Sequence, residues 1–215
     1  DTWIQSDMYA DGMECEMDNH DTTLSYGCMQ YGRMYRMVND KAAELIAGDG
    51  VNGINESGQW VTPFCQHESN PEVMFIGYNN LWRTTNLQQN SPSWTRISLN
   101  NGGGSITVVE NSPADGNLFY YATTGQSLVR SENIMDSSPN YVDLRDLLPG
   151  SGAITDVEAH PWDDNIVYIT RNRQVYKSDD KGLSWETITG NLPDVSLNDI
   201  AYYDRNSVEG LYVAS

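Results

Sequence analysis

Short runs of aromatic, aliphatic and β-branched residues recur along the chain and are separated by polar turns. Four of them are LSYGCM (24–29), VMFIGY (73–78), LFYYAT (118–123) and IVYITR (166–171). Runs of this composition and length are typical of β-strands. Each follows an acidic or Asn/Pro-rich turn and an earlier strand-like run, and these earlier runs are GMECEM, VTPFCQ, SITVVE and AITDVEA. The pattern therefore predicts an all-β protein.

A third set of segments gives the period of the pattern. RMYRM, NLWRT, SLVRS and QVYKS have central residues Tyr35, Trp82, Val129 and Tyr176, which are each 47 residues apart. A fourth strand follows, most clearly in SWTRIS (93–98) and SWETIT (184–189). Four strands in such a period predict an antiparallel blade of a β-propeller. A β-sandwich is the alternative, but it does not require equal intervals.

The period divides the chain into approximate blades, and the two ends are uneven. The expected ranges are 1–10 (last strand of a preceding blade, with Trp3), 11–58, 59–103, 104–151, 152–194 and 195–215 (first two strands of a further blade). We therefore expect residues 1–215 to be an incomplete portion of a larger propeller. The segment DKAAELIAG (40–48) is helix-like, and we expect at most a short turn or helix there.

The stretch SDDKGLSW (178–185) contains one polar turn in phase with the repeats. Its pattern residues are Ser178, Asp180, Gly182, Ser184 and Trp185. Glycine supplies a backbone angle that other residues avoid, and Asp and Ser side chains bond backbone N–H groups across turns. The tryptophan starts the fourth strand and can pack on the blade. We therefore interpret these five residues as structural rather than catalytic.

With its 47-residue blades, this turn is identified as an Asp-box and resembles the bacterial neuraminidase repeat family. Longer stretches are similar to sortilin-like Asp-box propellers of secreted or surface proteins of Bacteroidota, many exported by type IX secretion. These stretches are DGMECEMD (11–18), GQWVTPFCQHESNPEVMFIGYNNLWRTT (58–85), VYKSDDKGLSW (175–185) and VEGLYV (208–213). The resemblance implies a peripheral, structural box, an extracellular or cell-surface location and no assigned reaction.

The charge of the chain narrows the choice of partners. Thirty acidic residues against 12 basic ones give a net charge of −18. Such a surface repels phosphate backbones, so we expect neither nucleic acid nor an anionic membrane as partner. No apolar run approaches the roughly 18 residues that span a bilayer, so membrane insertion is not expected. An extracellular, salt-containing medium would screen the self-repulsion.

Two catalytic families share Asp-box propellers, and the sequence lacks the signature of each. Sialidases need three arginines for a substrate carboxylate, whereas Arg36, Arg83 and Arg130 recur at one repeat position, which indicates a structural role. The Phe-Arg-Ile-Pro motif is missing. Xyloglucanase-like propellers need two placed aspartates, and no equivalent of their motifs is found. No catalytic residue is assigned, and a glycoside hydrolase remains the alternative function.

Binding is the stronger functional hypothesis. Exposed aromatic rings can stack on sugars, and the candidates are Trp60, Trp82, Trp162, Tyr31 and Tyr78, with Tyr121 as a further one. The competing interpretation places most of them in the core. We expect a non-catalytic extracellular binding or scaffold module, covalently part of a longer chain, with a glycan or a surface protein as ligand. A structural component of a surface appendage or secretion assembly is a further alternative.

The sequence gives only weak indications of a metal site or of a disulfide. The segments 161–165 and 178–180 offer hard oxygen ligands for calcium but lack EF-hand spacing, so we favour ordinary turn chemistry and predict no cofactor. His20, His67 and His160 all fall near turns, where packing accounts for them. Cys15, Cys28 and Cys65 show no zinc spacing, and either a Cys15–Cys28 disulfide or buried free thiols fit the sequence.

Overall fold

The fold is described from a computed structural model, which covers residues 13–39, 41–99, 103–205 and 208–215. The strand expected around Trp3 lies outside these described residues. The chain divides between residues 100 and 101 into two compact units, and each is described by itself.

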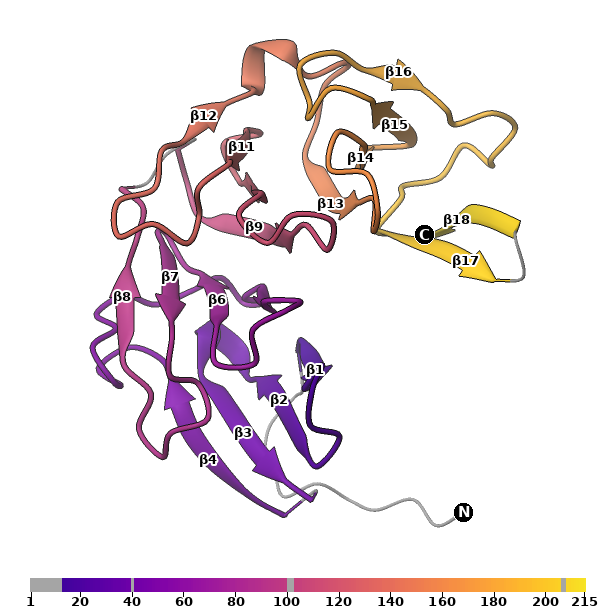
Figure 1. The fold of residues 1–215 in the computed structure, drawn as a ribbon. Helices are drawn as coiled ribbons and strands as arrows, with labels where there is room; N and C mark the ends of the chain where they lie inside the picture. Colours follow the sequence, from indigo (N-terminus) through magenta and orange to yellow (C-terminus); the bar gives the residue numbers. More distant parts are fainter. Residues whose placement is uncertain (1–12, 40, 100–102, 206–207) are drawn as a thin grey trace. The chain divides into compact units, whose positions relative to one another are not determined.

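The first unit holds two four-stranded antiparallel sheets whose strands are neighbours in chain order (Figure 1). The first sheet comprises β1 (Cys15–Met17), β2 (Leu24–Cys28), β3 (Met34–Val38) and β4 (Lys41–Ala47). The second comprises β5 (Phe64–Gln66), β6 (Met74–Gly77), β7 (Leu81–Thr84) and β8 (Trp94–Arg96). One buried cluster joins them, since it contains Tyr26 and Ile46 from the first sheet and Met74 and Trp94 from the second.

The second unit repeats this arrangement and adds a hairpin (Figure 1). Its first sheet comprises β9 (Ile106–Asn111), β10 (Phe119–Thr123), β11 (Leu128–Ser131) and β12 (Val142–Asp143). The next comprises β13 (Ile154–Ala159), β14 (Val167–Arg171), β15 (Gln174–Ser178) and β16 (Glu186–Thr187). A two-stranded sheet of β17 (Asp199–Arg205) and β18 (Val208–Ala214) follows. The prediction of an all-β chain built from four-stranded antiparallel units is confirmed.

The second strand is entirely buried in three of the sheets, and in one of them the third strand, β11, is entirely buried as well. Every residue of β6, β10 and β14 is buried. A strand covered on both faces needs apolar side chains on both, which explains runs such as FYYAT where no alternation is visible. The outermost strands β12 and β16 are two residues long and exposed. Within each unit, the sheets therefore bury their middle strands against one another, and this burial stabilises the unit.

The expectation of a turn or short helix over residues 40–48 is wrong. The segment Lys41–Ala47 is β4, which pairs antiparallel with β3 in the register Met34↔Ala47, Tyr35↔Leu45 and Arg36↔Glu44. Seven residues are too few for a helix to be stable by itself in water. Pairing gives the N–H and C=O groups along the free edge of β3 their partners and buries Ile46 and Ala47, so tertiary context outweighs helix propensity.

Helical structure is minor among the described residues. It consists of the 3-10 turns η1 (Gln30–Gly32) and η2 (Arg145–Leu147). Across the described ranges, no helix has the length and apolar character needed to cross a membrane.

Candidate functional site

The turn of residues 178–185 joins β15 to β16, and its polar side chains are occupied by one another. Asp180 is the centre: its Oδ1 accepts the Ser184 N–H at 2.7 Å, and its Oδ2 accepts the Ser184 hydroxyl at 2.6 Å. The Ser178 hydroxyl donates to Asp180 Oδ1 at 2.7 Å and accepts the Gly182 N–H at 2.8 Å. These hydrogen bonds lower the pKa of Asp180, with the Ser184 hydroxyl the largest cause. The group is held as a carboxylate and organises the turn.

Gly182 and Trp185 complete this turn. Gly182 has φ of +89°, and a Cβ there would lie 2.8 Å from Leu144 Cδ1. Trp185 donates its indole N–H to the Gly182 carbonyl at 3.1 Å and packs against the buried cluster of the second unit. All five pattern residues therefore serve the turn itself.

Two other turns reproduce this hydrogen bonding with asparagine as the central residue. Asn86 Oδ1 accepts the N–H of Ser93 at 2.9 Å and the hydroxyl of Thr84 at 2.9 Å. Asn133 Oδ1 accepts the N–H of Asn140 at 2.8 Å. In the sequence, RTTNLQQNSPSW and RSENIMDSSPNY are visible only as decayed versions of the Asp-box, because three extra residues separate the two ends of each turn and the aspartate is replaced. The signal that would find them is a Thr or Ser two residues before an Asn.

Trp82 and Tyr78 are not stacking platforms, which corrects two of the candidates. Trp82 is 5% exposed and donates its indole N–H to Glu56 Oε1 at 2.7 Å. Tyr78 is fully buried and donates its hydroxyl to the Gly32 carbonyl at 2.7 Å. Tyr121 is also buried. A ring enclosed by its neighbours stabilises the core and offers no face to a ligand.

Tyr31 and Trp60 do reach the surface, and they lie together. Tyr31 in η1 is 52% exposed and Trp60 in the loop from β4 to β5 is 53% exposed. Their ring centroids are 5.4 Å apart with the planes nearly perpendicular, at 87°. The Gly58 N–H donates to the Tyr31 carbonyl at 3.1 Å, so the two loops are bonded to each other. The pair is an apolar surface feature of the first unit.

Trp162 is the third exposed candidate, with 63% of its surface accessible. Its ring contacts His160 and Tyr202 edge-on, at centroid distances of 5.8 and 5.9 Å. His160 Nδ1 accepts the backbone N–H groups of Trp162 and Asp163 at 3.3 and 3.1 Å. The histidine thus fixes the turn between β13 and β14, and the Trp162 ring packs against the His160 ring.

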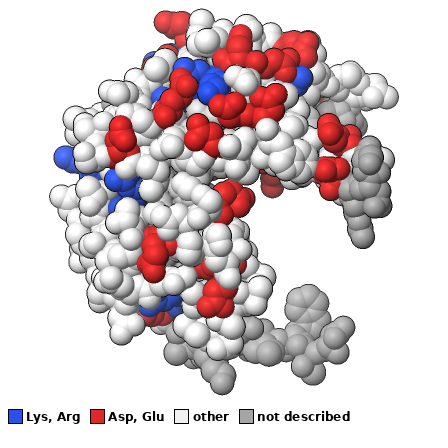
Figure 2. Space-filling view, in the orientation of Figure 1, with Lys and Arg blue, Asp and Glu red and all other residues white. Residues whose placement is uncertain are grey.

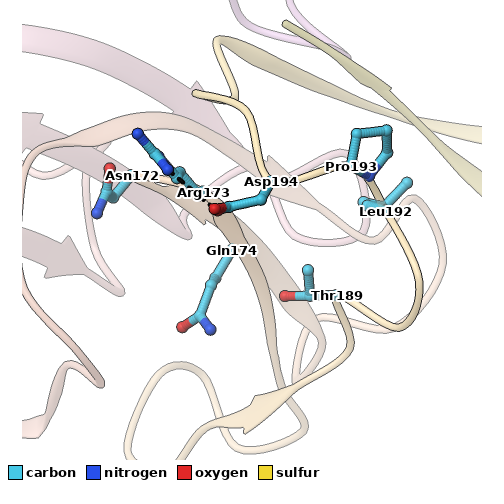
Figure 3. Close-up of a pocket in the computed structure, with 7 residues that line it drawn as sticks. All are labelled: Asn172, Arg173, Gln174, Thr189, Leu192, Pro193 and Asp194. Carbon is cyan, nitrogen blue, oxygen red and sulfur yellow. Dashed lines mark hydrogen bonds and ion pairs between the residues drawn. The ribbon is translucent and has the colours of Figure 1, made fainter.

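A pocket of about 300 Å³ lies in the second unit (Figure 3). Its lining residues are Asn172, Arg173, Gln174, Thr189, Leu192, Pro193 and Asp194. They come from the turn between β14 and β15 and from the loop between β16 and β17. Sequence reasoning did not identify this pocket, because RNRQ and TGNLPD read as ordinary polar turns.

The Tyr31–Trp60 pair and the pocket occupy equivalent connections of the repeat. We use the term loop pair for the turn between the second and third strands of a sheet together with the loop that leads to the next sheet. Asn172 follows Tyr31 by three 47-residue periods, and both residues are left-handed, with φ of 60° and 65°. The Leu197 N–H donates to the Asn172 carbonyl at 2.9 Å, as Gly58 does to Tyr31. The chain therefore presents side chains at two loop pairs.

Carboxylates on the first strands of the sheets bond to the first strand of the next sheet. Glu16 lies 3.3 Å from the Gln66 N–H, and Asp156 Oδ2 and Glu158 Oε1 accept the N–H groups of Ile200 and Tyr202 at 2.9 and 2.8 Å. A strand at a sheet edge has unpaired N–H groups, and these carboxylates satisfy some of them. Burial raises the pKa of Glu16 and of Asp156 to about 7 in each case.

Within the described ranges, no group of three or more His, Cys, Asp or Glu residues is placed to hold a metal ion. In the two segments that offer oxygen ligands for calcium, Asp163 Oδ1 accepts the Asn165 N–H at 3.0 Å, and Asp180 accepts hydrogen bonds from Ser178 and Ser184. The three cysteines are free, so the Cys15–Cys28 disulfide is not formed. Burial raises the pKa of the Cys28 thiol, which is therefore unreactive.

Figure 2 shows the carboxylates spread over the visible face of the chain, with far fewer basic groups among them. The field of this surface repels anions and attracts cations.

The repeated antiparallel sheets define the chain as a β-propeller protein, and solved structures agree. An ancestral GH74 enzyme matches with a TM-score of 0.66 and 19% identity over 89% of this chain and 26% of that one. The GH74 xyloglucanase from Xanthomonas campestris matches with a TM-score of 0.64 and 14% identity over 93% of this chain and 35% of that one. YCF48 from Cyanidioschyzon merolae matches with a TM-score of 0.63 and 13% identity, over 94% of this chain and 66% of that one.

At these identities the likeness establishes the fold alone. The chain spans between a quarter and about a third of the length of the two GH74 enzymes. No protein-family model and no curated protein matches the sequence.

Proposed function

We propose that this chain is a non-catalytic binding module of a larger secreted or cell-surface protein and that it contacts its ligand through the loop pairs. The observation that carries the proposal is the exposed Tyr31–Trp60 pair, whose rings lie 5.4 Å apart on two connected loops. Binding residues are found disproportionately on loops that a rigid scaffold positions. Here the scaffold is the pair of stacked sheets beneath the loops.

The pair is held in place before any ligand arrives. Gly32, next to Tyr31, packs so closely that a Cβ there would lie 2.3 Å from Tyr78 Cε1. The buried Tyr78 hydroxyl bonds to the same glycine. A preorganised site loses little conformational entropy on binding. Large rings with two side-chain torsions offer contact area at low entropic cost, which suits a ligand platform.

The charge of the chain supports an extracellular location and a neutral or cationic ligand. A net charge of −18 keeps the molecule soluble and disfavours anionic partners. The Asp-box turn and the resemblance to secreted sortilin-like propellers of Bacteroidota favour the same location. We place the ligand among neutral glycans or surface proteins.

A glycan panel with a matched pair of variants tests this function. The wild-type chain, Trp60→Ala and Trp162→Ala are compared on a glycan array and by affinity electrophoresis in gels containing single polysaccharides. We expect Trp60→Ala to weaken binding by about 10- to 30-fold, the cost of losing a central tryptophan anchor. Trp162→Ala removes a somewhat more exposed indole from a turn outside the loop pairs and serves as the control. Equal retardation of all three proteins would contradict the assignment to the Tyr31–Trp60 pair.

A glycoside hydrolase is the second candidate function, and one observation favours it. The Asp156 carboxyl has its pKa raised to about 7, chiefly by burial and further by its hydrogen bond with Asp199 and the charge of that residue. A protonated carboxyl beside a second carboxyl resembles the acid of a glycosidase. If the chain is such an enzyme, it releases reducing ends from a neutral polysaccharide such as xyloglucan, and Asp156→Asn abolishes the release. Equal background release by both proteins would remove this candidate.

A further inference from the structure

The pocket between residues 172–174 and 189–194 is lined by both hydrogen-bond donors and hydrogen-bond acceptors. Arg173 and Asp194 form an ion pair at 3.0 Å (Figure 3). In that view, Asn172 lies on one side of the ion pair, and Leu192 and Pro193 lie on the other. The pocket therefore combines donors, acceptors and a small apolar wall.

The walls of this pocket are fixed by hydrogen bonds that do not involve a ligand. The Asn172 carbonyl accepts the Leu197 N–H at 2.9 Å, which ties the β14–β15 turn to the loop after β16. The Thr189 hydroxyl oxygen accepts the Val175 N–H at 3.0 Å. Gln174 Oε1 accepts the hydroxyl proton of Tyr176. Because Oε1 is engaged in this bond, the amide nitrogen is the group of this side chain that remains to bond to a ligand.

The charge balance of the lining selects among ligand classes. The charge of the one guanidinium is already balanced by a carboxylate, so an anion would gain little attraction in a chain of net charge −18. A cation would be repelled by the Arg173 guanidinium. An apolar ligand would displace water from two amides and an ion pair without replacing the hydrogen bonds of that water, which is unfavourable. A hydroxyl group both donates and accepts, so a ligand with several hydroxyls satisfies all of these groups.

The size of the pocket agrees with one sugar ring. A volume of about 300 Å³ is at the small end of ligand pockets in proteins. Leu192 and Pro193 can cover the C–H face of a pyranose, while the ion pair and the two amides bond to its hydroxyls.

We propose that this pocket binds one neutral hexose unit of an oligosaccharide, held by Arg173, Asp194, Asn172 and Gln174. The proposal rests on the proposed binding function and assigns its second ligand site, at the loop pair equivalent to that of Tyr31. The unit can belong to a β-glucan or to a mannan, since both present the same neutral hydroxyls.

Nuclear magnetic resonance of the whole ¹⁵N-labelled chain tests the proposal. The probes are cellotetraose, mannotetraose and, as the acidic comparator, 3′-sialyllactose. The signals followed are the side-chain amides of Asn172 and Gln174 and the indole N–H of Trp60. We expect a neutral tetrasaccharide at about 10 mM, well above millimolar dissociation constants, to shift both amide signals. The tetrasaccharide that does so identifies the source of the hexose.

Two variants separate the pocket from the rest of the surface. Asp194→Ala removes a side chain that is 84% exposed, so it leaves the fold intact, and we expect about tenfold weaker binding at the amides. Arg145→Ala removes half of another exposed ion pair of the second unit, Arg145–Asp143, and is the control. Binding that is weakened by Asp194→Ala and unchanged by Arg145→Ala supports the proposal.

Three results would overturn it. Amide signals that no neutral tetrasaccharide shifts, or that only sialyllactose shifts, would remove the neutral hexose from this pocket. Saccharide binding that shifts only Trp60 and persists in Asp194→Ala would overturn the pocket while leaving the proposed function standing. The failure of the proposed function is a different result, namely a glycan array on which nothing binds the wild-type chain.

Discussion

Arg130 Nη1 donates a hydrogen bond of 2.6 Å to the carbonyl oxygen of Lys181, in the β15–β16 turn of the next sheet. Arg36 makes the equivalent contact in the first unit, from Nη1 to the Leu87 carbonyl at 2.8 Å. Both arginines are nearly buried and also pair with an acidic side chain, Glu132 and Glu44, at 2.7 and 2.6 Å. At positions 36 and 130, the recurring arginine thus links one sheet to the turn of the next within its unit.

The first prediction concerns this link. Arg130→Met keeps much of the apolar stem but leaves the Lys181 carbonyl without its partner, and Glu132 keeps only the Lys181 ammonium at 3.5 Å. A charge-assisted hydrogen bond to a buried carbonyl contributes about 1.5–3 kcal/mol, and we expect a loss of stability of that size. Urea unfolding followed by tryptophan fluorescence measures it. Arg173→Met removes an arginine that is about half exposed and should cost less than about 1 kcal/mol. Similar losses in both variants would contradict the structural role of Arg130.

The second prediction concerns the centre of the 178–185 turn. Asp180→Ala removes the acceptor of the Ser184 N–H and hydroxyl and should destabilise the chain by about 1–2 kcal/mol. Asp180→Asn should cost only about 0.5 kcal/mol, because Asn86 and Asn133 perform the same task in their own turns. Urea unfolding compares the two variants. An asparagine variant as unstable as the alanine variant would show that the charge matters and not the hydrogen-bond geometry.

The sequence predicted the period, the strands and the role of the Asp180 turn, because each depends on local patterning. It could not show which aromatic residues are exposed, since Trp60 and Trp82 have similar polar neighbours in the sequence. Their difference arises from packing: Trp82 lies on a middle strand, whereas Trp60 lies on a connecting loop. The pocket could not be predicted from the sequence for the same reason, because Arg173 and Asp194 are 21 residues apart and come together only in the folded chain.

The third prediction concerns the glycine beneath the aromatic pair. Gly32→Ala places a methyl group 2.3 Å from Tyr78 Cε1 at a φ of +79°. The clash and the left-handed backbone together should cost about 3 kcal/mol or more and should displace Tyr31. Gly50→Ala is the control, since its φ is +77° but a Cβ there has open space. It should cost only about 1–2 kcal/mol, the price of the backbone conformation alone. Equal losses would show that packing against Tyr78 is unimportant.

The fourth prediction is a dependence of stability on pH that originates in the half-buried Glu16 carboxyl. Burial raises its pKa from 4.5 to about 7, and the charges of Glu68, Asp18 and Glu14 act in the same direction, against the hydrogen bond from the Gln66 N–H. Between these two pKa values the folded chain binds more protons than the unfolded chain, so stability must fall as the pH rises from about 5 to about 8. The decrease from this group amounts to at most about 3 kcal/mol.

Asp156 contributes in the same direction, because its pKa is also raised to about 7. The lowered pKa of Asp180 acts only in more acidic solution, where that carboxylate takes up a proton. Urea unfolding at pH 5.5 and pH 8 measures the difference for the wild-type chain and for Glu16→Gln, which keeps an acceptor near the Gln66 N–H. The variant should show a clearly smaller difference. Glu186→Gln removes one negative charge from an exposed strand, and its difference should match that of the wild type. A wild-type chain more stable at pH 8 than at pH 5.5 would contradict the burial of these carboxyls as the dominant effect.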